Sequence, residues 1–213
     1  MLIAIVFTVI VYFFAIVLHE VAHGLAAYAL GDPTAKDEGR LTLNPIPHID
    51  PFGTVILPLI LALPALAGAS PVIFGWAKPV PFNPMYFKNV RRGTLIVASA
   101  GVATNLLIAV IFGVILRYIA GPAFNIPLET LESLGFILSR IVIANLVLGI
   151  FNLFPIPPLD GSKILFSILP KALEPIQLFL ERFGIFLLLL FLVFTPGVLA
   201  FLVQYMFQLI VGF

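Results

Sequence analysis

The sequence predicts an all-α polytopic membrane protein with about five to six membrane segments and a short β-like or re-entrant region between the first and the third. Three observations predict this class. Of the 213 residues, 62% are hydrophobic and 10% are charged, and the mean hydropathy is +1.18, well outside the range of soluble domains. Apolar stretches of about the length that spans a bilayer recur along the chain. A polar, proline-containing region lies between the first and the third of them.

Six apolar stretches are candidate membrane segments, because a span needs about 20 apolar residues. They are residues 2–30, 52–74, 93–120, 134–154, 176–195 and 198–213. The first lacks a basic amino-terminal region and continues well past residue 18, so we interpret it as a membrane helix and not as a signal peptide. Together the six stretches predict a single domain over residues 1–213.

The most polar part of the chain, residues 31–51, follows the first apolar stretch. Within it, residues 40–43 alternate between polar and apolar, as a short strand does. We expect a second extended piece at residues 78–82, where Pro79 and Pro81 suit an edge strand or an irregular loop. These two pieces form the predicted β-like region.

Charge and cysteine content exclude several classes of function. The net charge is only +1, so the chain has no basic surplus of the kind that nucleic-acid binding requires, and we expect no nucleic-acid partner. Cysteine is absent, which excludes disulfides, thiolate metal ligands and a cysteine nucleophile. Any bound metal must therefore use His, Asp and Glu side chains.

The sequence HEVAH at residues 19–23 lies within the first apolar stretch. Residues four apart lie on one face of a helix, so His19 and His23 can direct their imidazoles at one ion. This geometry suits Zn²⁺, and we expect one ion per chain. Glu20 lies about 100° around the helix from His19, so it could reach a water on that ion and take its proton.

The alternative is that His19 and His23 are ordinary interior histidines of a packed bundle. However, two of the three histidines of the chain and a glutamate share one turn of an otherwise apolar helix. Ionisable groups within a membrane span cost a few kcal/mol each by insertion scales. Their default interpretation is therefore functional.

A catalytic zinc usually has three protein ligands and one open position for water, so a third ligand is required. The candidates are Asp160, Asp50 and His48. Asp160 follows an apolar segment whose prolines at 155, 157 and 158 must break the helix, and non-helical backbone at membrane depth is typical of a protein-lined cavity. The alternative role for Asp160 is to cap the helix that follows it.

The roles of His48 and Asp50 stay open between three possibilities. They could be an alternative ligand pair, they could gate the site, or they could form a polar turn before Pro51. We favour the turn, because Asp before Pro commonly starts one.

Two motifs together resemble the site-2 protease family of intramembrane metalloproteases: HExxH early in the chain, and NLFPIPPLDG at residues 152–161 late in it. The resemblance covers about residues 1–165, the expected catalytic core, and the short chain is similar to the compact prokaryotic branch of the family. It implies that His19, His23 and Asp160 ligate zinc, that Glu20 is the general base and then acid, and that Asn152 helps to orient the substrate or its oxyanion.

Three further stretches are similar to that branch: GVATN at residues 101–105, which resembles a Gly-Pro-x-x-Asn element with Val102 in place of the proline, and residues 44–51 and 75–83. The resemblance implies an intramembrane zinc endopeptidase that hydrolyses peptide bonds within or near transmembrane segments. The expected partners are the lipid bilayer and single-span membrane-protein substrates, and the expected location is a prokaryotic cell membrane.

A shared ion constrains the membrane topology. If His23 and Asp160 bind one ion, the first segment and residues 134–154 must run parallel, because both ligands lie toward the exit ends of their segments. Full crossings by residues 52–74, 93–120 and 134–154 would make them antiparallel. We therefore predict that residues 52–74, which contain three prolines, re-enter the membrane and return to their starting side.

The distribution of basic residues agrees with this topology. The re-entrant model places residues 36, 40, 78, 88, 91, 92, 163 and 171 on one side and residues 117 and 140 on the other. By the positive-inside rule, the amino terminus lies outside and the active site lies nearer the cytoplasmic face.

Two other functions remain as alternatives. A membrane metal-ion carrier also places His and Asp within the membrane, but it needs no general base beside two ligands, so Glu20 distinguishes it from a protease. A catalytically inactive relative could bind membrane proteins without cutting them. The intact HExxH sequence and Asp160 argue against it.

Overall fold

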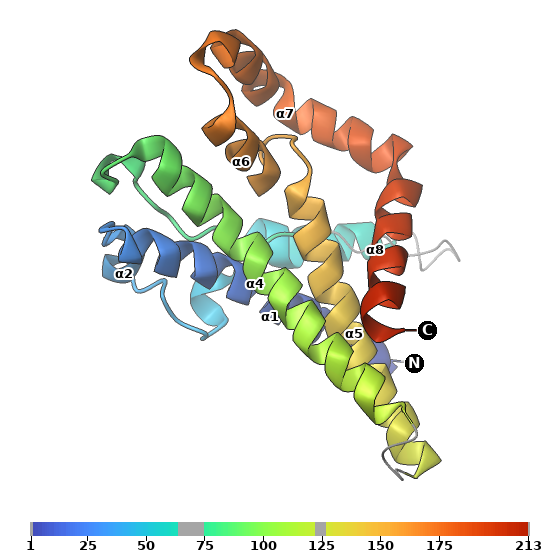
Figure 1. Cartoon of the computed structure of the whole chain (residues 1–213). Helices are drawn as coiled ribbons and strands as arrows, with labels where there is room; N and C mark the ends of the chain where they lie inside the picture. Colours follow the sequence, from blue (N-terminus) through green and yellow to red (C-terminus); the bar gives the residue numbers. More distant parts are fainter. Residues whose placement is uncertain (1, 64–74, 122–126, 213) are drawn as a thin grey trace.

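The computed structural model describes residues 2–63, 75–121 and 127–212, and every regular element in these ranges is a helix (Figure 1). Five helices are long: α1 (Leu2–Ala29), α4 (Val90–Ile119), α5 (Leu128–Leu153), α7 (Glu174–Phe194) and α8 (Pro196–Val211). The shorter ones are α2 (Thr34–Asp37), η1 (Ile46–His48), η2 (Pro51–Ile56), α3 (Leu57–Ala62), η4 (Pro84–Tyr86), α6 (Asp160–Ile168) and η5 (Lys171–Leu173).

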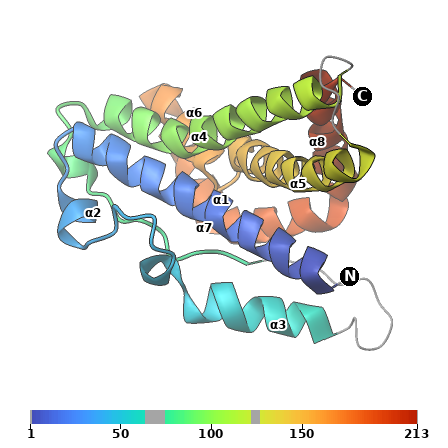
Figure 2. The same ribbon diagram turned by 90° about the horizontal axis from the view of Figure 1, so that it is seen from below.

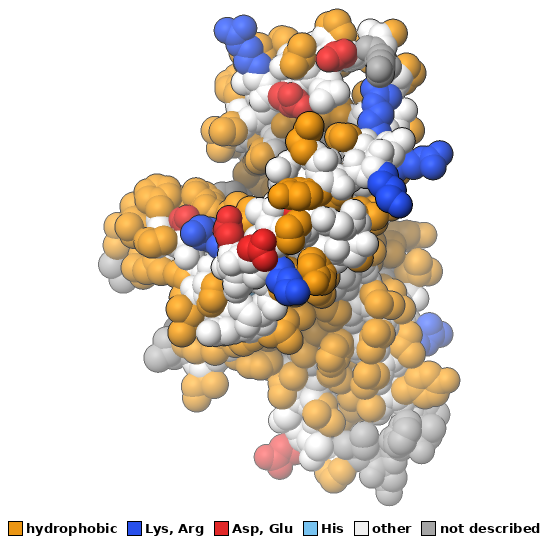
Figure 3. Space-filling view, turned by 90° about the vertical axis from the view of Figure 1, so that its left-hand side faces the viewer, with side chains coloured by type: hydrophobic (Ala, Val, Ile, Leu, Met, Phe, Trp, Pro, Cys, Tyr) orange, Lys and Arg blue, Asp and Glu red, His pale blue; other side chains and the backbone are white. Residues whose placement is uncertain are grey.

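Four of the described helices are long and apolar enough to cross a membrane: Ile3–Ala29, Val90–Ile119, Leu128–Leu153 and Glu174–Phe194. Pro51–Ile60 and Gly197–Val211 are apolar but shorter. Hydrophobic side chains also cover broad areas of the surface (Figure 3), as expected for helices that face lipid. The expected all-α membrane protein is confirmed, whereas the expected number of five to six membrane segments is not.

Helix α4 lies at the centre of the bundle and packs against α1, α5, α6 and α8. Its main hydrophobic cluster joins α4, α5 and α8 through Ala109, Val142, Leu146, Ile150 and Val203. Helices α1 and α5 run in the same general direction and α4 runs against them (Figures 1 and 2). The carboxyl-terminal ends of α1 and α5 therefore lie toward the same end of the bundle, as a metal shared between residues 23 and 160 requires.

The region predicted to re-enter the membrane is only partly described. Its first half forms η2 and α3, and residues 64–74 lie outside the described part. Trp76, which follows this region, nevertheless lies beside its start, because the N–H of Trp76 donates to the carbonyl of Gly53 over 3.2 Å. The re-entrant course of residues 52–74 stays a prediction.

The predicted β-like region is not confirmed. Neither residues 40–43 nor residues 78–82 form a strand, and the two pieces are joined through a side chain, because Arg40 donates from Nη2 to the carbonyls of Lys78 and Pro79. The physical reason lies in the prolines: Pro79 and Pro81 have no N–H, so residues 78–82 cannot donate the regular hydrogen bonds of a ladder.

The local sequence determines where the helices near the site begin and end. The side chain of Asn89 accepts a hydrogen bond from the N–H of Arg92 and caps α4. Helix α5 ends just before Pro155, which cannot continue it. Helix α6 then starts against the end of α5, where a Cβ on Gly161 would overlap the carbonyls of Leu153 and Phe154. Only glycine permits this approach, which brings Asp160 back toward α1.

Candidate metal centre

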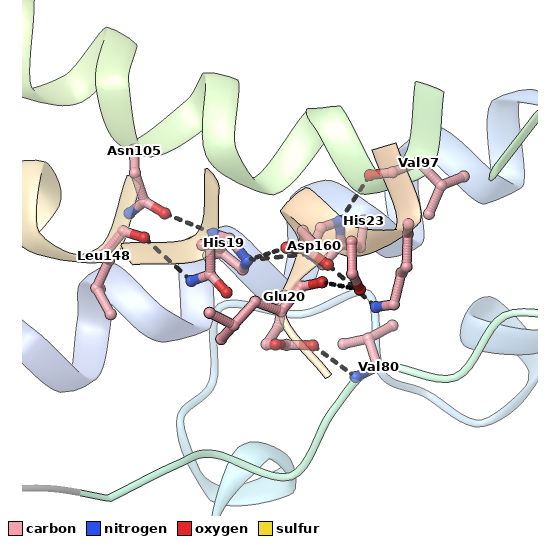
Figure 4. A network of polar contacts seen from close by, with 12 residues as sticks. His19, Glu20, His23, Val80, Val97, Asn105, Leu148 and Asp160 are labelled. Carbon is pink, nitrogen blue, oxygen red and sulfur yellow. Dashed lines mark hydrogen bonds and ion pairs between the residues drawn. The ribbon is translucent and has the colours of Figure 1, made fainter. Parts of the chain in front are cut away.

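Helices α1 and α6 bring together three of the residues that the sequence predicted as ligands (Figure 4). Asp160 Oδ2 lies 2.9 Å from His19 Nε2 and 3.0 Å from His23 Nε2, and the two Nε2 atoms lie 3.0 Å apart. All three residues are buried, with exposed fractions of 5%, 7% and 4% for His19, His23 and Asp160. The three donor atoms thus form a small, nearly equilateral triangle inside the protein.

The hydrogen-bond partners of the two Nδ1 atoms, which point away from the triangle, determine the tautomer of each imidazole. His23 Nδ1 lies 2.7 Å from the carbonyl oxygen of Val97, and His19 Nδ1 lies 2.6 Å from Oδ1 of Asn105. Both oxygens only accept, so both Nδ1 atoms are donors, and each neutral imidazole then presents a lone pair at Nε2. With both imidazoles neutral, two nitrogen lone pairs and a carboxylate oxygen face one another, an arrangement that suits a cation between them.

The residues fit zinc. Tetrahedral zinc binds His and carboxylate at about 2.0–2.2 Å, which places neighbouring donor atoms roughly 3.3 Å apart. The observed separations of 2.9–3.0 Å require the triangle to expand by only a few tenths of an ångström. Outer-shell acceptors that fix both imidazoles are also typical of zinc histidines.

Glu20 lies beside this triangle and belongs to the same group of potential metal ligands as the two histidines. Its Oε2 accepts a hydrogen bond of 2.8 Å from the backbone N–H of Val80 (Figure 4). One carboxylate oxygen is therefore held by the backbone of residues 75–83.

A buried polar network continues outward from His19. Asn105 on α4 donates through Nδ2 to Oδ1 of Asn145 on α5, over 2.8 Å, and to the carbonyl of Ala15, over 3.2 Å. Both asparagines are buried, with exposed fractions of 0% and 3%. Asn105 is thus held by α1 and α5 with its oxygen directed at the imidazole.

Gly101, one turn before Asn105, allows α4 to approach the imidazoles closely. A Cβ at this position would lie 2.6 Å from Cε1 of His23 and 2.7 Å from Cε1 and Nε2 of His19. Any side chain here would therefore press on the predicted ligands. The two ends of the GVATN sequence have separate tasks, since the glycine makes space and the asparagine orients an imidazole.

The second oxygen of the Asp160 carboxylate faces a cation. Lys163, one turn further along α6, donates from Nζ to Asp160 Oδ1 over 3.0 Å. Because Lys163 occupies Oδ1, the carboxylate presents Oδ2 alone to the two histidines.

Within the part of the chain that the structure describes, the other candidate residues form no hydrogen bond or ion pair with the triangle. His48 is fully buried and bonds through Nε2 to the carbonyl of Thr42, while Asp50 caps η2 by accepting the N–H of Gly53. Asp50 thus forms the favoured polar turn. Asn152 donates to the carbonyl of Leu148, within its own helix, so its proposed contact with substrate stays a prediction.

Sequence reasoning missed four contributors: Asn145, Lys163, the carbonyl of Val97 and the N–H of Val80. Asn145 could have been noticed as a polar residue inside an apolar segment, and Lys163 as the partner one turn after a carboxylate. No local signal identifies the other two, because their contacts join segments that are far apart in the sequence.

Comparison with known proteins agrees with this geometry. The family model described as Peptidase family M50 matches residues 128–194. YwhC of Bacillus subtilis, whose name marks it as a candidate zinc metalloprotease, is 40% identical over 185 residues, covering 84% of this chain and 76% of YwhC. Rip2 proteins of Mycolicibacterium smegmatis and Mycobacterium tuberculosis, named in the same way, are 32% and 31% identical over 84% and 82% of this chain.

This chain spans only 63% and 62% of those two Rip2 proteins. No solved structure gives a significant match. YwhC, however, is similar over most of the length of both chains. The chain therefore belongs to peptidase family M50, the site-2 protease family, and is an integral membrane zinc metalloprotease.

Proposed function

We propose that this enzyme hydrolyses peptide bonds within or near the transmembrane segments of single-span membrane proteins. His19, His23 and Asp160 hold one zinc ion, and Glu20 is the general base and then the general acid. The observation that carries the proposal is the buried triangle of Nε2, Nε2 and Oδ2 with the Glu20 carboxylate beside it.

When bound, zinc supplies Lewis acidity, which polarises a carbonyl and lowers the pKa of a water molecule toward neutral. Glu20 accepts the proton of the attacking water and passes it to the leaving amine. Asn105 and Val97 keep both imidazoles in the tautomer that presents Nε2. The reaction needs no acyl-enzyme, since no side chain attacks the peptide.

A helical substrate hides its peptide bonds in its own hydrogen bonds, so it must unwind locally before hydrolysis. Helix-breaking residues near the cleavage site should therefore favour cleavage. The charge distribution supports an orientation in which the active site lies nearer the cytoplasmic side of a prokaryotic cell membrane. We also propose that residues 1–213 form one domain.

The experiment incubates purified protein with a panel of single-span membrane proteins. It compares the wild type, the wild type with a zinc chelator, Glu20→Gln, and the control Glu38→Gln, in which an exposed glutamate is changed. Glu20→Gln should keep its zinc and lose nearly all cleavage, whereas Glu38→Gln should match the wild type. A metal-ion carrier would instead retain zinc transport in Glu20→Gln, and cleavage that survives both the substitution and chelation contradicts the proposal.

A further inference from the structure

A buried arginine, Arg40, has no place in the mechanism above. Only 4% of it is exposed, and among the described residues it forms no ion pair with a carboxylate. Its Nη2 donates to two backbone carbonyls, and its Nε is buried without a hydrogen-bond partner. A guanidinium taken out of water without a counter-charge carries a large desolvation penalty, so its position requires an explanation.

Arg40 contacts the two backbone carbonyls directly before Val80, whose N–H donates to Glu20. Nη2 lies 2.7 Å from the carbonyl oxygen of Lys78 and 3.2 Å from that of Pro79. The Pro79 carbonyl belongs to the same peptide unit as the Val80 N–H, which donates to Glu20. This peptide bond is trans, so its C=O and N–H point in opposite directions. One peptide plane is therefore held between the guanidinium and the carboxylate.

We propose that Arg40 is a positioning residue for Glu20, acting through the Pro79–Val80 peptide unit. This inference rests on the role of Glu20 proposed above. A cation on the carbonyl side polarises the peptide, and the N–H then forms a stronger hydrogen bond with the carboxylate. The guanidinium also fixes the direction of that N–H, and thus which Glu20 oxygen remains available for the proton.

The sequence around Val80 makes this contact specific. Because Pro79 and Pro81 lack an N–H, Val80 has the only backbone donor among the three residues. Val80 itself is 5% exposed, and its side chain packs near Gly24 on α1. A small shift of the segment therefore cannot replace one donor by the next.

Two further contacts fix the segment on either side of Val80. The N–H of Lys78 donates to the carbonyl of His48 over 2.8 Å, and the N–H of Asn83 donates to Asp32 Oδ2 over 2.6 Å. Burial acts to raise the pKa of Asp32, but the hydrogen bonds from Thr34 and Asn83 outweigh it and hold that pKa below its ordinary value. Asp32 therefore stays a charged acceptor. Arg40 completes this set at the peptide unit that matters for catalysis.

The first test measures hydrogen exchange and does not depend on cleavage. Residues 79–81 have a single backbone N–H, that of Val80, and its exchange is measured in the whole protein. We expect this amide to exchange roughly tenfold faster, or more, in both Arg40→Ala and Glu20→Ala than in the wild type, with little further gain in the double variant. The control Lys36→Ala changes an exposed cation of the same polar region that contacts Tyr28. It should leave the exchange unchanged.

The second test separates positioning from folding by kinetics. Arg40→Ala should lower kcat about 10–100-fold, with KM within about twofold and with the zinc content of the wild type, and Arg40→Lys should recover part of the loss. Val80→Pro removes the donor and Val80→Ala retains it. In the Val80→Pro background, Arg40→Ala should lower kcat little further, because both substitutions interrupt the same series of contacts from Arg40 through the Pro79–Val80 peptide to Glu20.

The outcomes distinguish this inference from the proposed function. If the wild type cleaves no substrate, the proposed function fails. If the wild type cleaves but Arg40→Ala leaves both the Val80 exchange and kcat unchanged, the role of Arg40 is overturned. The same holds if Arg40→Ala loses zinc or stability in proportion to activity. Should Val80→Pro not fold, the exchange comparison of the two alanine variants still decides.

Discussion

Replacement of Gly101 by alanine should weaken zinc binding, and the size of the effect follows from the structure. The added Cβ would lie 2.6 Å from Cε1 of His23 and 2.7 Å from Nε2 of His19, whereas non-bonded carbon atoms prefer about 3.5–4.0 Å. Either α4 or both imidazoles must therefore move by roughly 1 Å. Metal sites require ligand distances within about 0.2 Å of ideal values.

We expect Gly101→Ala to reduce zinc affinity at least 10–100-fold, the loss typical when the support of a ligand is disturbed, and to reduce stability by about 1–3 kcal/mol through overpacking. The assay is competition for zinc with a chromophoric chelator, accompanied by thermal unfolding in detergent. Gly135→Ala is the control, because nothing lies within 4 Å of a Cβ added there. A folded Gly101→Ala protein with wild-type zinc affinity would refute the reasoning.

Three further predictions concern the metal centre and the topology. Asn105→Ala should lower zinc affinity about 10–100-fold, whereas Asn152→Ala should keep zinc, and reversed affinities would contradict the assigned contacts. Lys163→Gln should weaken zinc binding by a smaller factor, because the Asp160 carboxylate then loses the contact that fixes its orientation. Unchanged affinity in the same competition assay would argue against an orienting role of Lys163. Cysteines introduced at Lys36 and Lys88 should react with an impermeant reagent from the same side, and labelling from opposite sides would exclude the re-entrant model.

The three residues of the buried triangle, which are the proposed metal ligands, could be singled out because their signals are local. His19 and His23 follow from one helical turn, and Asp160 follows from a break that three prolines impose on an apolar segment. The four described helices that are long and apolar enough to cross a membrane could be predicted for a similar reason, since hydropathy reports burial in lipid directly, whereas the predicted number of five to six segments is not confirmed. Each of these inferences uses only a few neighbouring residues.

Most of the supporting contacts could not be predicted, because, unlike the pair of Lys163 and Asp160, they join segments far apart in the chain. A glycine in an apolar helix has no sequence feature that indicates which side chain it faces, so the closeness of Gly101 to both imidazoles had no signal. The alternation at residues 40–43 indicated a strand, but Arg40 instead bonds backbone carbonyls with its side chain. The alternation of polar and apolar residues is a poor indicator of a strand where prolines in the expected partner segment remove the N–H donors of a ladder.

The distance along the chain between the ligands has a consequence for biosynthesis. His19 and Asp160 are 141 residues apart, so α1 enters the membrane long before α6 is synthesised. A nascent chain that ends before α6 offers an ion only two imidazoles, one ligand fewer than a catalytic zinc site usually has. On the proposed ligand set, we therefore expect zinc acquisition to be a late step of biogenesis, so that an unfinished protease does not cut the membrane proteins that are inserted beside it.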